Sequence, residues 1–316
     1  MTENNIWPLC SEHRKSKDGV IMKIGIIGGG SIGLLISSYL CVGHKVTIYV
    51  RRMEQKQKIN DHGLYLSGNL TPFPVKALLL DEIKKEDYII ICVKQSQVST
   101  ILTKINKDDQ DTPVVFLQNG MGHIEQFNET NKTVFLGVVE HGALREGDNI
   151  VCQTGKGIIK LAAFQEEDKG KLKTFAQQLT QDYFPVKPAA EWRQLLSEKL
   201  VINAVINPLT ALFHVKNGAI LHNPYINELA KELCRESSMV LNLDYFKQWK
   251  LVQMVAENTQ ENISSMLKDI QSHQQTEIEA ISGYIIRQSN EQTQIPYTKF
   301  VYHAVKSQEM LGERDV

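Results

Sequence analysis

The sequence predicts an α/β half followed by an all-α half. Three observations support this fold class. Short apolar, β-branched runs alternate with helical patterns as far as about residue 180. An apolar run from Lys23 leads directly into a G-x-G-x-x-G motif, and a helical run follows it. Beyond residue 185 only long helical patterns remain, so we expect an N-terminal Rossmann-type dinucleotide-binding domain and an all-α C-terminal domain.

The glycine motif, Gly28-x-Gly30-x-x-Gly33, lies between a predicted strand and a predicted helix. In such a motif the first glycine permits a tight turn, the second lets the backbone approach a pyrophosphate, and the third lets helix and strand pack closely. The positive end of the helix dipole then faces the phosphates. A glycine-rich turn without a ligand is the alternative, but the flanking elements favour a dinucleotide site. Its expected contacts are Gly28, Gly29, Gly30, Ser31, Ile32 and Gly33.

The second strand-like run, residues 44–50, indicates which dinucleotide to expect. A site for NAD usually has an acidic residue after this strand, where the carboxylate binds the ribose hydroxyls. This chain has Arg51 and Arg52 there. A guanidinium can bind a 2′-phosphate through paired, charge-assisted hydrogen bonds, whereas a carboxylate would repel it. The sequence therefore predicts NADP(H) as cofactor, and a merely solvated basic pair is the disfavoured alternative.

The remaining elements of the first half follow from hydrophobic periodicity. Continuous apolar runs indicate strands buried on both faces, and apolar residues at helical spacing indicate helices. We expect strands at 88–93, 113–117 and 134–139, a hairpin of 149–153 with 157–161, and helices at 53–61, 96–105 and 169–180.

The domain boundary is expected near residues 183–189. This gives an NADP-binding domain over 22–185 and a helical substrate and catalytic domain over 186–316, with Pro224 and Gly283 interrupting the helices. Ligands of such folds bind beyond the carboxyl ends of the strands, so we expect the cleft between the sheet and the helical half. Residues 1–21 have no apolar pattern and are expected to form a poorly ordered extension.

The composition is that of an ordinary globular protein, with 42% hydrophobic and 22% charged residues in a chain of 316. A net charge of −1 gives no reason to expect a nucleic acid or a membrane surface as partner. Five scattered cysteines without pairing or metal-ligand spacing fit a reducing cytoplasm, and we expect no metal site. We also expect no apolar run of membrane-spanning length.

Two loops after predicted strands carry polar candidates. Lys94 follows the strand at 88–93, and Asn119-Gly120 follows the strand at 113–117. Both would project from the carboxyl edge of the sheet toward a cofactor. A solvated lysine at a helix start and an ordinary tight turn are the alternatives, since Asn-Gly favours turns by itself.

Lys199, Asn203 and Asn207 recur at intervals of four in a strongly apolar helical run. Because an α-helix has about 3.6 residues per turn, these side chains form one polar stripe. Buried amides and ammonium groups are costly unless they are partnered, which favours a functional site over the exposed face of an amphipathic helix. Pro208 is expected to disturb and bend this helix beside Asn207.

A second polar set lies nearer the C-terminus. Asn262 and Ser265 are three residues apart and would share a helix face. Glu277 can join them only if the helix breaks between residues 269 and 275. By themselves, these side chains are better explained as helix-surface or capping residues.

Taken together, the motifs resemble those of the ketopantoate reductase (2-dehydropantoate 2-reductase) family over nearly all of the chain from Met22 onward. The resemblance rests on the glycine motif, Val93-Lys94, Asn119-Gly120-Met121-Gly122, the run Lys199 to Thr210, Glu261 to Met266, and Thr276-Glu277-Ile278. Departures are local: Glu279 stands where the family often has Asp, Ser282-Gly283 replaces Asn-Gly, and Trp192 is displaced.

The resemblance implies NADPH-dependent reduction of ketopantoate to D-pantoate, a step toward pantothenate and coenzyme A. Lys199 would protonate and stabilise the developing alkoxide, which suits an ammonium group. Glu277 would orient Lys199 and anchor the substrate hydroxyl. Further substrate contacts are implied for Asn119, Asn203, Asn207, Asn262 and Ser265, and further cofactor contacts for Arg51, Lys94, Asn119 and Ala143.

Two other functions stay open from the sequence. One is another NADP-dependent 2-oxoacid or hydroxyacid reductase of the same two-domain plan. The other is a redox sensor that binds NADP(H) without turnover, although a sensor would need neither Lys199 nor Glu277. We expect a cytoplasmic enzyme with a small-molecule substrate. A homodimer is one option, and the sequence does not decide the oligomeric state.

Overall fold

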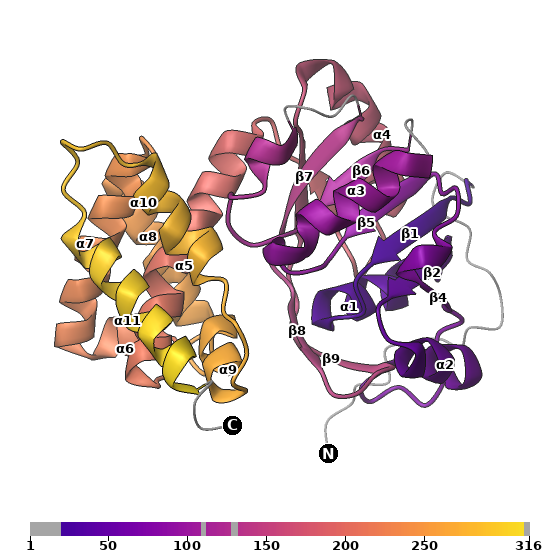
Figure 1. Ribbon diagram of the computed structural model, residues 1–316, viewed down its shortest axis with the longest axis horizontal. Helices are drawn as coiled ribbons and strands as arrows, with labels where there is room; N and C mark the ends of the chain where they lie inside the picture. The colour runs from indigo at the N-terminus through magenta and orange to yellow at the C-terminus, as the bar shows by residue number, and fades with distance from the viewer. Residues whose placement is uncertain (1–19, 109–111, 128–131, 313–316) are drawn as a thin grey trace. The chain divides into compact units, whose positions relative to one another are not determined.

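The computed structural model describes residues 20–108, 112–127 and 132–312, which form two compact units (Figure 1). The first unit takes in the described residues up to 93, 97–118 and 132–192. The second takes in 94–96, 119–127 and 193–312, so two short loops group by their contacts with the C-terminal helices. The extension expected over residues 1–21 lies outside the described residues except for its last two positions.

The first unit is built on an eight-stranded sheet in the order β11-β10-β7-β6-β5-β1-β2-β4. Neighbouring strands of this sheet are parallel except for β7 and β10. The strands are β1 (Lys23–Ile27), β2 (Lys45–Val50), β4 (Lys76–Leu79), β5 (Tyr88–Ile91), β6 (Val114–Phe116), β7 (Val134–Val139), β10 (Ile159–Ala163) and β11 (Val186–Pro188). The helices are α1 (Ser31–Leu40), α2 (Met53–His62), α3 (Val98–Asp108) and α4 (Lys169–Leu179).

The order of the strands fixes where this sheet can bind a ligand. β1 lies between β2 and β5, so the chain passes to one side of β1 first and to the other side later. In open α/β sheets such a reversal marks the binding crevice at the carboxyl ends of the strands. The predicted fold class is confirmed, and the glycine motif follows the central strand of this reversal.

A small three-stranded sheet, β3-β9-β8, packs against α1. Its strands are β3 (Tyr65–Leu66), β8 (Gly142–Arg145) and β9 (Ile150–Gly155). The predicted hairpin of 149–153 with 157–161 is therefore wrong. β9 pairs antiparallel with β8, whereas β10 is almost fully buried and joins the main sheet beside β7. β8 has the sequence Gly-Ala-Leu-Arg, which has no periodic apolar pattern, so this pairing could not be recognised from periodicity.

The turn between β1 and α1 shows why glycine is needed there. Gly28 has φ +116°, a conformation in which a side chain is strained. A Cβ on Gly33 would lie 1.9 Å from the Gly28 carbonyl oxygen, so α1 crosses β1 more closely than a side chain allows. Gly30 precedes α1 with open space around it. These are the turn and the close packing that the motif predicts.

The second unit is helical (Figure 1). It contains α5 (Trp192–Phe213, whose first residue groups with the first unit), α6 (Ala219–His222), α7 (Pro224–Val240), α8 (Tyr245–Asn258), α9 (Ser265–Gln271), a π-helical segment (Glu279–Gly283) continuing into α10 (Tyr284–Gln288), and α11 (Pro296–Gly312). Pro224 interrupts the helices as predicted, because α6 ends at His222 and α7 begins at Pro224, whereas Gly283 interrupts none, because the π-helical segment continues into α10. α5 likewise continues through Pro208 to Phe213.

α5 contributes to the hydrophobic core of the second unit. Val201, Val205 and Leu209 are almost completely buried in its core. Contrary to the prediction, this helix is long and apolar enough to cross a membrane by length and composition alone. However, 72% of its apolar window is buried inside the protein, as in the core helix of a globular domain.

Replacing Gly33 by alanine should destabilise the first unit, because the added Cβ would overlap the Gly28 carbonyl oxygen. We expect the free energy of unfolding to fall by ~1–3 kcal/mol, the usual cost of overpacking a core. Gly170→Ala in α4 is the matched control, since a Cβ there meets nothing within 4 Å. Urea unfolding of both variants measures the difference. Equal stability of the two variants would contradict the close approach of α1 and β1.

Candidate active site

Glu277 is half-buried in the second unit. It follows an interruption of the helical structure, since α9 ends at Gln271 and His273 has φ +51°. The Asn119 amide donates a hydrogen bond from Nδ2 to Glu277 Oε2 over 2.9 Å. Burial raises the pKa of the Glu277 carboxyl above its usual range, and the Asn119 hydrogen bond and the Lys94 charge oppose this rise. A carboxyl group perturbed in this way is a typical functional-site feature.

The contact between Asn119 and Glu277 depends on Gly120. This glycine has φ +80°, and a Cβ on it would lie 2.2 Å from the carbonyl oxygen of Ala280 in the π-helical segment. The adjacent Met121 is buried, and its Sδ accepts a hydrogen bond from Ser197 Oγ of α5 over 3.7 Å. The tight turn and the site are therefore not alternatives, because the turn is what brings the Asn119 amide to Glu277.

Lys94 contacts the chain segment that precedes Glu277. Its ammonium group donates to Asp269 Oδ1 over 3.0 Å and to the carbonyl oxygen of Gln275 over 2.7 Å. Burial raises the pKa of the Asp269 carboxyl, and the contact with Lys94 opposes the rise. Lys94 thus holds the segment that leads into Glu277, and an ammonium group with three donors has one further N–H for a ligand.

The polar stripe on α5 is largely inside the protein. Asn203 and Asn207 are only 7% and 8% exposed, and Lys199 is half-buried. The alternative of an exposed amphipathic face is therefore wrong for these two asparagines. Asn203 Nδ2 is buried and has no hydrogen-bond partner among the described residues. Leaving such a donor unpaired costs ~1–3 kcal/mol, so the amide indicates a place for a polar ligand.

Asn262 and Ser265 were predicted to share a helix face, but they do not. α8 ends at Asn258 and α9 begins at Ser265, so Asn262 lies in the connecting loop. Both side chains are exposed. Asn262 therefore lies in a loop and Ser265 begins a helix, an arrangement that residue spacing alone could not distinguish from one continuous helix.

Ser264, which the sequence analysis passed over, has the structural role at the start of α9. Its Oγ accepts hydrogen bonds from the Leu267 backbone N–H over 3.1 Å and from Thr210 Oγ1 over 2.8 Å. Thr210 lies within one helical turn of Asn207 on α5. The Thr210–Ser264 contact therefore ties the start of α9, where Ser265 lies, to the end of the polar stripe. A serine three residues before Leu267 is the cap signal that could have identified it.

In the first unit, the predicted cofactor residues surround the turn after β1. Arg51 is exposed at the end of β2, whereas Arg52 forms an ion pair with Asp148. Gln55 Nε2 donates to the carbonyl oxygens of Gly29 and Asp148, each over 2.9 Å. The motif gave no indication of Gln55 or Asp148, because their contacts join segments far apart in the sequence.

The β8 strand also reaches this turn. The Arg145 backbone N–H donates to Ser31 Oγ over 3.1 Å, and its guanidinium Nη1 donates to the Gly29 carbonyl oxygen over 3.4 Å. Ala143, two residues earlier, is half-buried and pairs with Gln153 of β9. The exposed Arg145 thus adds positive charge beside the glycine motif, and sequence analysis missed it.

The fit of a dinucleotide to this turn can be judged from its backbone. Gly30 has no atom within 4 Å of a hypothetical Cβ, which leaves room for a phosphate to approach the start of α1. The exposed cations Arg51 and Arg145 supply the charge that a phosphorylated ligand needs. The residues present therefore fit NADP(H).

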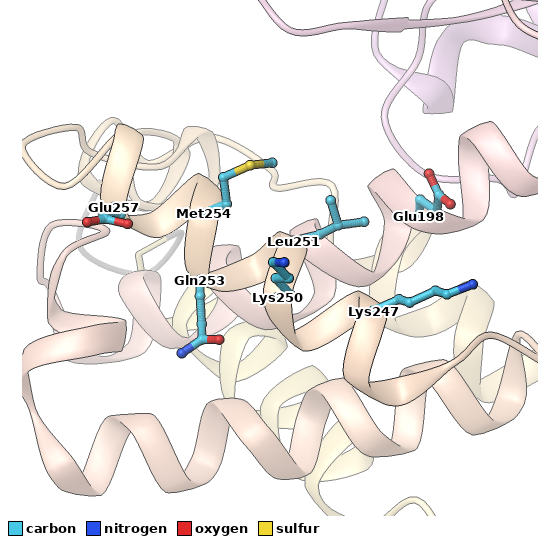
Figure 2. A pocket seen from close by; sticks show the side chains of 7 residues that line it. All are labelled: Glu198, Lys247, Lys250, Leu251, Gln253, Met254 and Glu257. Carbon is cyan, nitrogen blue, oxygen red and sulfur yellow. The ribbon is translucent and has the colours of Figure 1, made fainter.

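A separate hollow of about 650 Å³ lies on the surface of α8 (Figure 2). It is lined by Glu198 of α5 and by Lys247, Lys250, Leu251, Gln253, Met254 and Glu257 of α8. None of the predicted site residues lines it. Its side chains are mostly exposed, so it has none of the buried polar groups that mark the α5 stripe.

The sequence matches models of one protein family over most of its length. Residues 24–166 match ketopantoate reductase PanE/ApbA, and residues 191–309 match the C-terminal part of the same family. The 2-dehydropantoate 2-reductase of Bacillus subtilis (strain 168) is 38% identical over 91% of this chain and 98% of its own length. The 2-dehydropantoate 2-reductase of Pyrococcus horikoshii is 30% identical over 92% of this chain and 99% of its own length.

Solved structures share the fold. A crystal structure of a probable 2-dehydropantoate 2-reductase from Bacillus subtilis has a TM-score of 0.82 and 37% identity, and the match covers 90% of this chain and 99% of the other. D-mandelate dehydrogenase with NADH and anilino(oxo)acetate has a TM-score of 0.86 at 24% identity, which shows the fold alone; the match covers 92% and 100% of the two chains. The resemblance seen in the motifs is confirmed: this chain belongs to the ketopantoate reductase family.

Proposed function

We propose that this protein reduces ketopantoate to D-pantoate with NADPH, a step toward pantothenate and coenzyme A. The observation that carries the proposal is the polar stripe of α5, in which Lys199 is half-buried and Asn203 and Asn207 are buried. Within this stripe, Asn203 Nδ2 has no hydrogen-bond partner among the described residues. Family membership supports the same activity, because the relatives that match over nearly their whole length are named 2-dehydropantoate 2-reductases.

The first unit supplies the proposed cofactor contacts. NADPH, when bound, supplies the hydride that reduces the keto carbon. The backbone from Gly28 to Gly33 would lie against the pyrophosphate, with the N–H groups of Ser31 and Ile32 at the positive end of α1. Arg51 would bind the 2′-phosphate, and Arg145 would add a second cation. Ala143 is a further cofactor contact in this unit, and Lys94 and Asn119, which belong to the second unit, are also assigned to the cofactor.

The second unit supplies the proposed substrate contacts. The Lys199 ammonium group would donate a proton to the oxygen of the reduced carbonyl and stabilise the charge that develops there. Glu277, as a carboxylate, would accept a hydrogen bond from the substrate hydroxyl and orient Lys199. Asn203, Asn207 and Asn262 would bind polar groups of the substrate, with Ser265 and Asn119 toward its carboxylate.

Location and assembly belong to the same proposal. We place the enzyme in the cytoplasm, because its substrate and cofactor are small, charged metabolites and its cysteines have no pairing pattern. A homodimer is the assembly to test first. A ketopantoate reductase from Staphylococcus aureus with the same fold is described as dimeric, at 22% identity and a TM-score of 0.75.

An assay of NADPH consumption with ketopantoate and a panel of other branched 2-oxoacids tests the function. We expect kcat/KM to be highest for ketopantoate, because the hydroxyl-binding groups of the site would otherwise lose a partner. A higher kcat/KM for a 2-oxoacid without that hydroxyl would favour a different reductase. NADPH binding without turnover of any of them would favour a redox sensor.

Lys199→Ala should lower kcat by ~10²–10⁴, the usual contribution of a positioned general acid. The dissociation constant for NADPH should stay nearly unchanged, because the proposed phosphate contacts lie in the first unit. Lys250→Ala, which removes an exposed lysine from α8, is the control and should leave turnover, NADPH affinity and thermal stability unchanged. Turnover, NADPH affinity and thermal stability are measured on both variants. Near-normal turnover of Lys199→Ala would refute the assignment, and joint loss of stability and NADPH binding would make Lys199 structural.

Arg51 should give the enzyme its preference for NADPH over NADH. We expect a preference of at least ~10-fold, since one charge-assisted hydrogen bond contributes roughly 1.5–3 kcal/mol. Arg51→Glu should remove most of it by repelling the 2′-phosphate. Arg52→Ala should change it much less, because the Arg52 guanidinium already pairs with Asp148. The ratio of kcat/KM for the two cofactors is the measurement, and equal use of both by the unmodified enzyme would overturn the assignment.

A further inference from the structure

We propose that Glu309 is a positioning residue for Glu277. Its carboxylate binds the backbone N–H of Thr276, the residue directly before Glu277. The inference deepens the function proposed above, since it concerns the carboxylate assigned to the substrate hydroxyl and to Lys199. Glu309 lies in the last part of α11, and this helix packs against α9, α7 and the π-helical segment.

The Glu309 carboxylate is buried and both of its oxygens are bound. Oε1 accepts hydrogen bonds from the Thr276 backbone N–H over 2.8 Å and from Thr276 Oγ1 over 2.6 Å. Oε2 accepts a hydrogen bond from the Lys306 ammonium group over 2.6 Å, which raises the pKa of Lys306. The Glu309 side chain is only 7% exposed. Charge-assisted bonds to both oxygens hold such a carboxylate in one orientation.

These contacts fix the chain on both sides of Glu277. Thr276 precedes Glu277 directly, and its Oγ1 also accepts a hydrogen bond from the Ile278 backbone N–H over 3.1 Å. The N–H groups immediately before and after Glu277 are therefore both tied to the Thr276–Glu309 pair. One residue earlier, the Gln275 carbonyl oxygen is held by Lys94. The backbone at Gln275 and Thr276, the two residues before Glu277, is thus anchored to side chains from outside this segment.

A catalytic carboxylate needs such anchoring because its own chain segment provides little. Glu277 stands at the first turn of a helix that continues as a π-helical segment, where the regular ladder of helical hydrogen bonds is altered. A displacement of about 1 Å at a reacting group can cost ~10² in rate. Without Glu309, the Thr276 N–H would lose its acceptor and the first turn would be free to shift away from Asn119.

A double-mutant cycle tests whether Glu309 acts through Glu277. Glu309→Ala should lower kcat/KM for ketopantoate ~10–100-fold, mostly as a higher KM with a smaller fall in kcat, while the NADPH dissociation constant is unchanged. In a Glu277→Ala background the same substitution should add less than about twofold, because the group it positions is gone. Full additivity of the two losses, or no loss from Glu309→Ala, would overturn the proposal.

Conservative and control variants separate positioning from a general structural role. Glu309→Gln keeps an oxygen that can accept from Thr276 and should retain most of the activity. Thr276→Ala, which keeps the backbone N–H but removes the hydroxyl, should lose part of the activity, and Thr276→Ser should restore it. This pair also serves if Glu309→Ala does not fold. Glu228→Ala, which breaks an exposed ion pair of the same i, i+3 spacing in α7, is the matched control and should change nothing.

Hydrogen exchange followed by mass spectrometry gives a readout that does not depend on turnover. The amides of residues 276–283 should exchange faster in Glu309→Ala than in the wild type, Glu309→Gln or Glu228→Ala. If the wild type did not reduce ketopantoate, the proposed function would fail, yet faster exchange would still support the anchoring by Glu309. Unchanged exchange in Glu309→Ala would overturn the anchoring whatever the substrate is.

Discussion

Stabilising a partly buried carboxylate is the constraint on which the second unit depends. Glu277 is half-buried, burial raises the pKa of its carboxyl, and the charged form needs hydrogen bonds and opposite charge close by. Asn119 supplies the hydrogen bond and Lys94 the opposite charge, although both follow strands of the first unit along the chain. This explains why two short loops group with the C-terminal helices, and why one of them needs Gly120 for its close approach to Ala280.

The same constraint connects the fold to the chemistry. α5 is apolar enough to form the core of the second unit, yet it carries Lys199, Asn203 and Asn207 on one face. A core helix tolerates such residues when a ligand completes their hydrogen bonds, and Asn203 Nδ2, for which the described part of the chain offers no hydrogen-bond partner, fits this proposal. The first unit is suited to a different ligand. Its glycine turn and exposed arginines favour a phosphorylated ligand through backbone dipoles and surface charge.

Sequence reasoning succeeded where the signal is local and failed where it is a long-range pairing. The glycine motif, the buried strands and the α5 stripe each depend on residues within one or two elements, so their spacing identifies them. The hydrogen-bond partners of the site residues cannot be identified from local spacing, because they are distant in the sequence. Arg145 bonds to Ser31 across 114 residues, Lys94 to Asp269 across 175, and Glu309 to Thr276 across 33. The β8–β9 pairing was missed for the same reason, since β8 has no periodic apolar pattern and is defined only by its partner.

If Glu277 works as an ionised carboxylate in a partly buried position, the acid limb of the pH–activity profile is the most direct test. Burial raises the pKa of Glu277, so as the pH falls the carboxylate takes up a proton and loses the negative charge that strengthens its proposed hydrogen bonds to the substrate and to Lys199. The pH profile of kcat/KM for ketopantoate should therefore fall through a single-proton step whose apparent pKa lies above the ordinary value for glutamate, about 4.3. In Glu277→Gln that step should be absent and the remaining activity flat over the same range. An unchanged acid limb in Glu277→Gln, or a step at or below the ordinary value, would contradict the account.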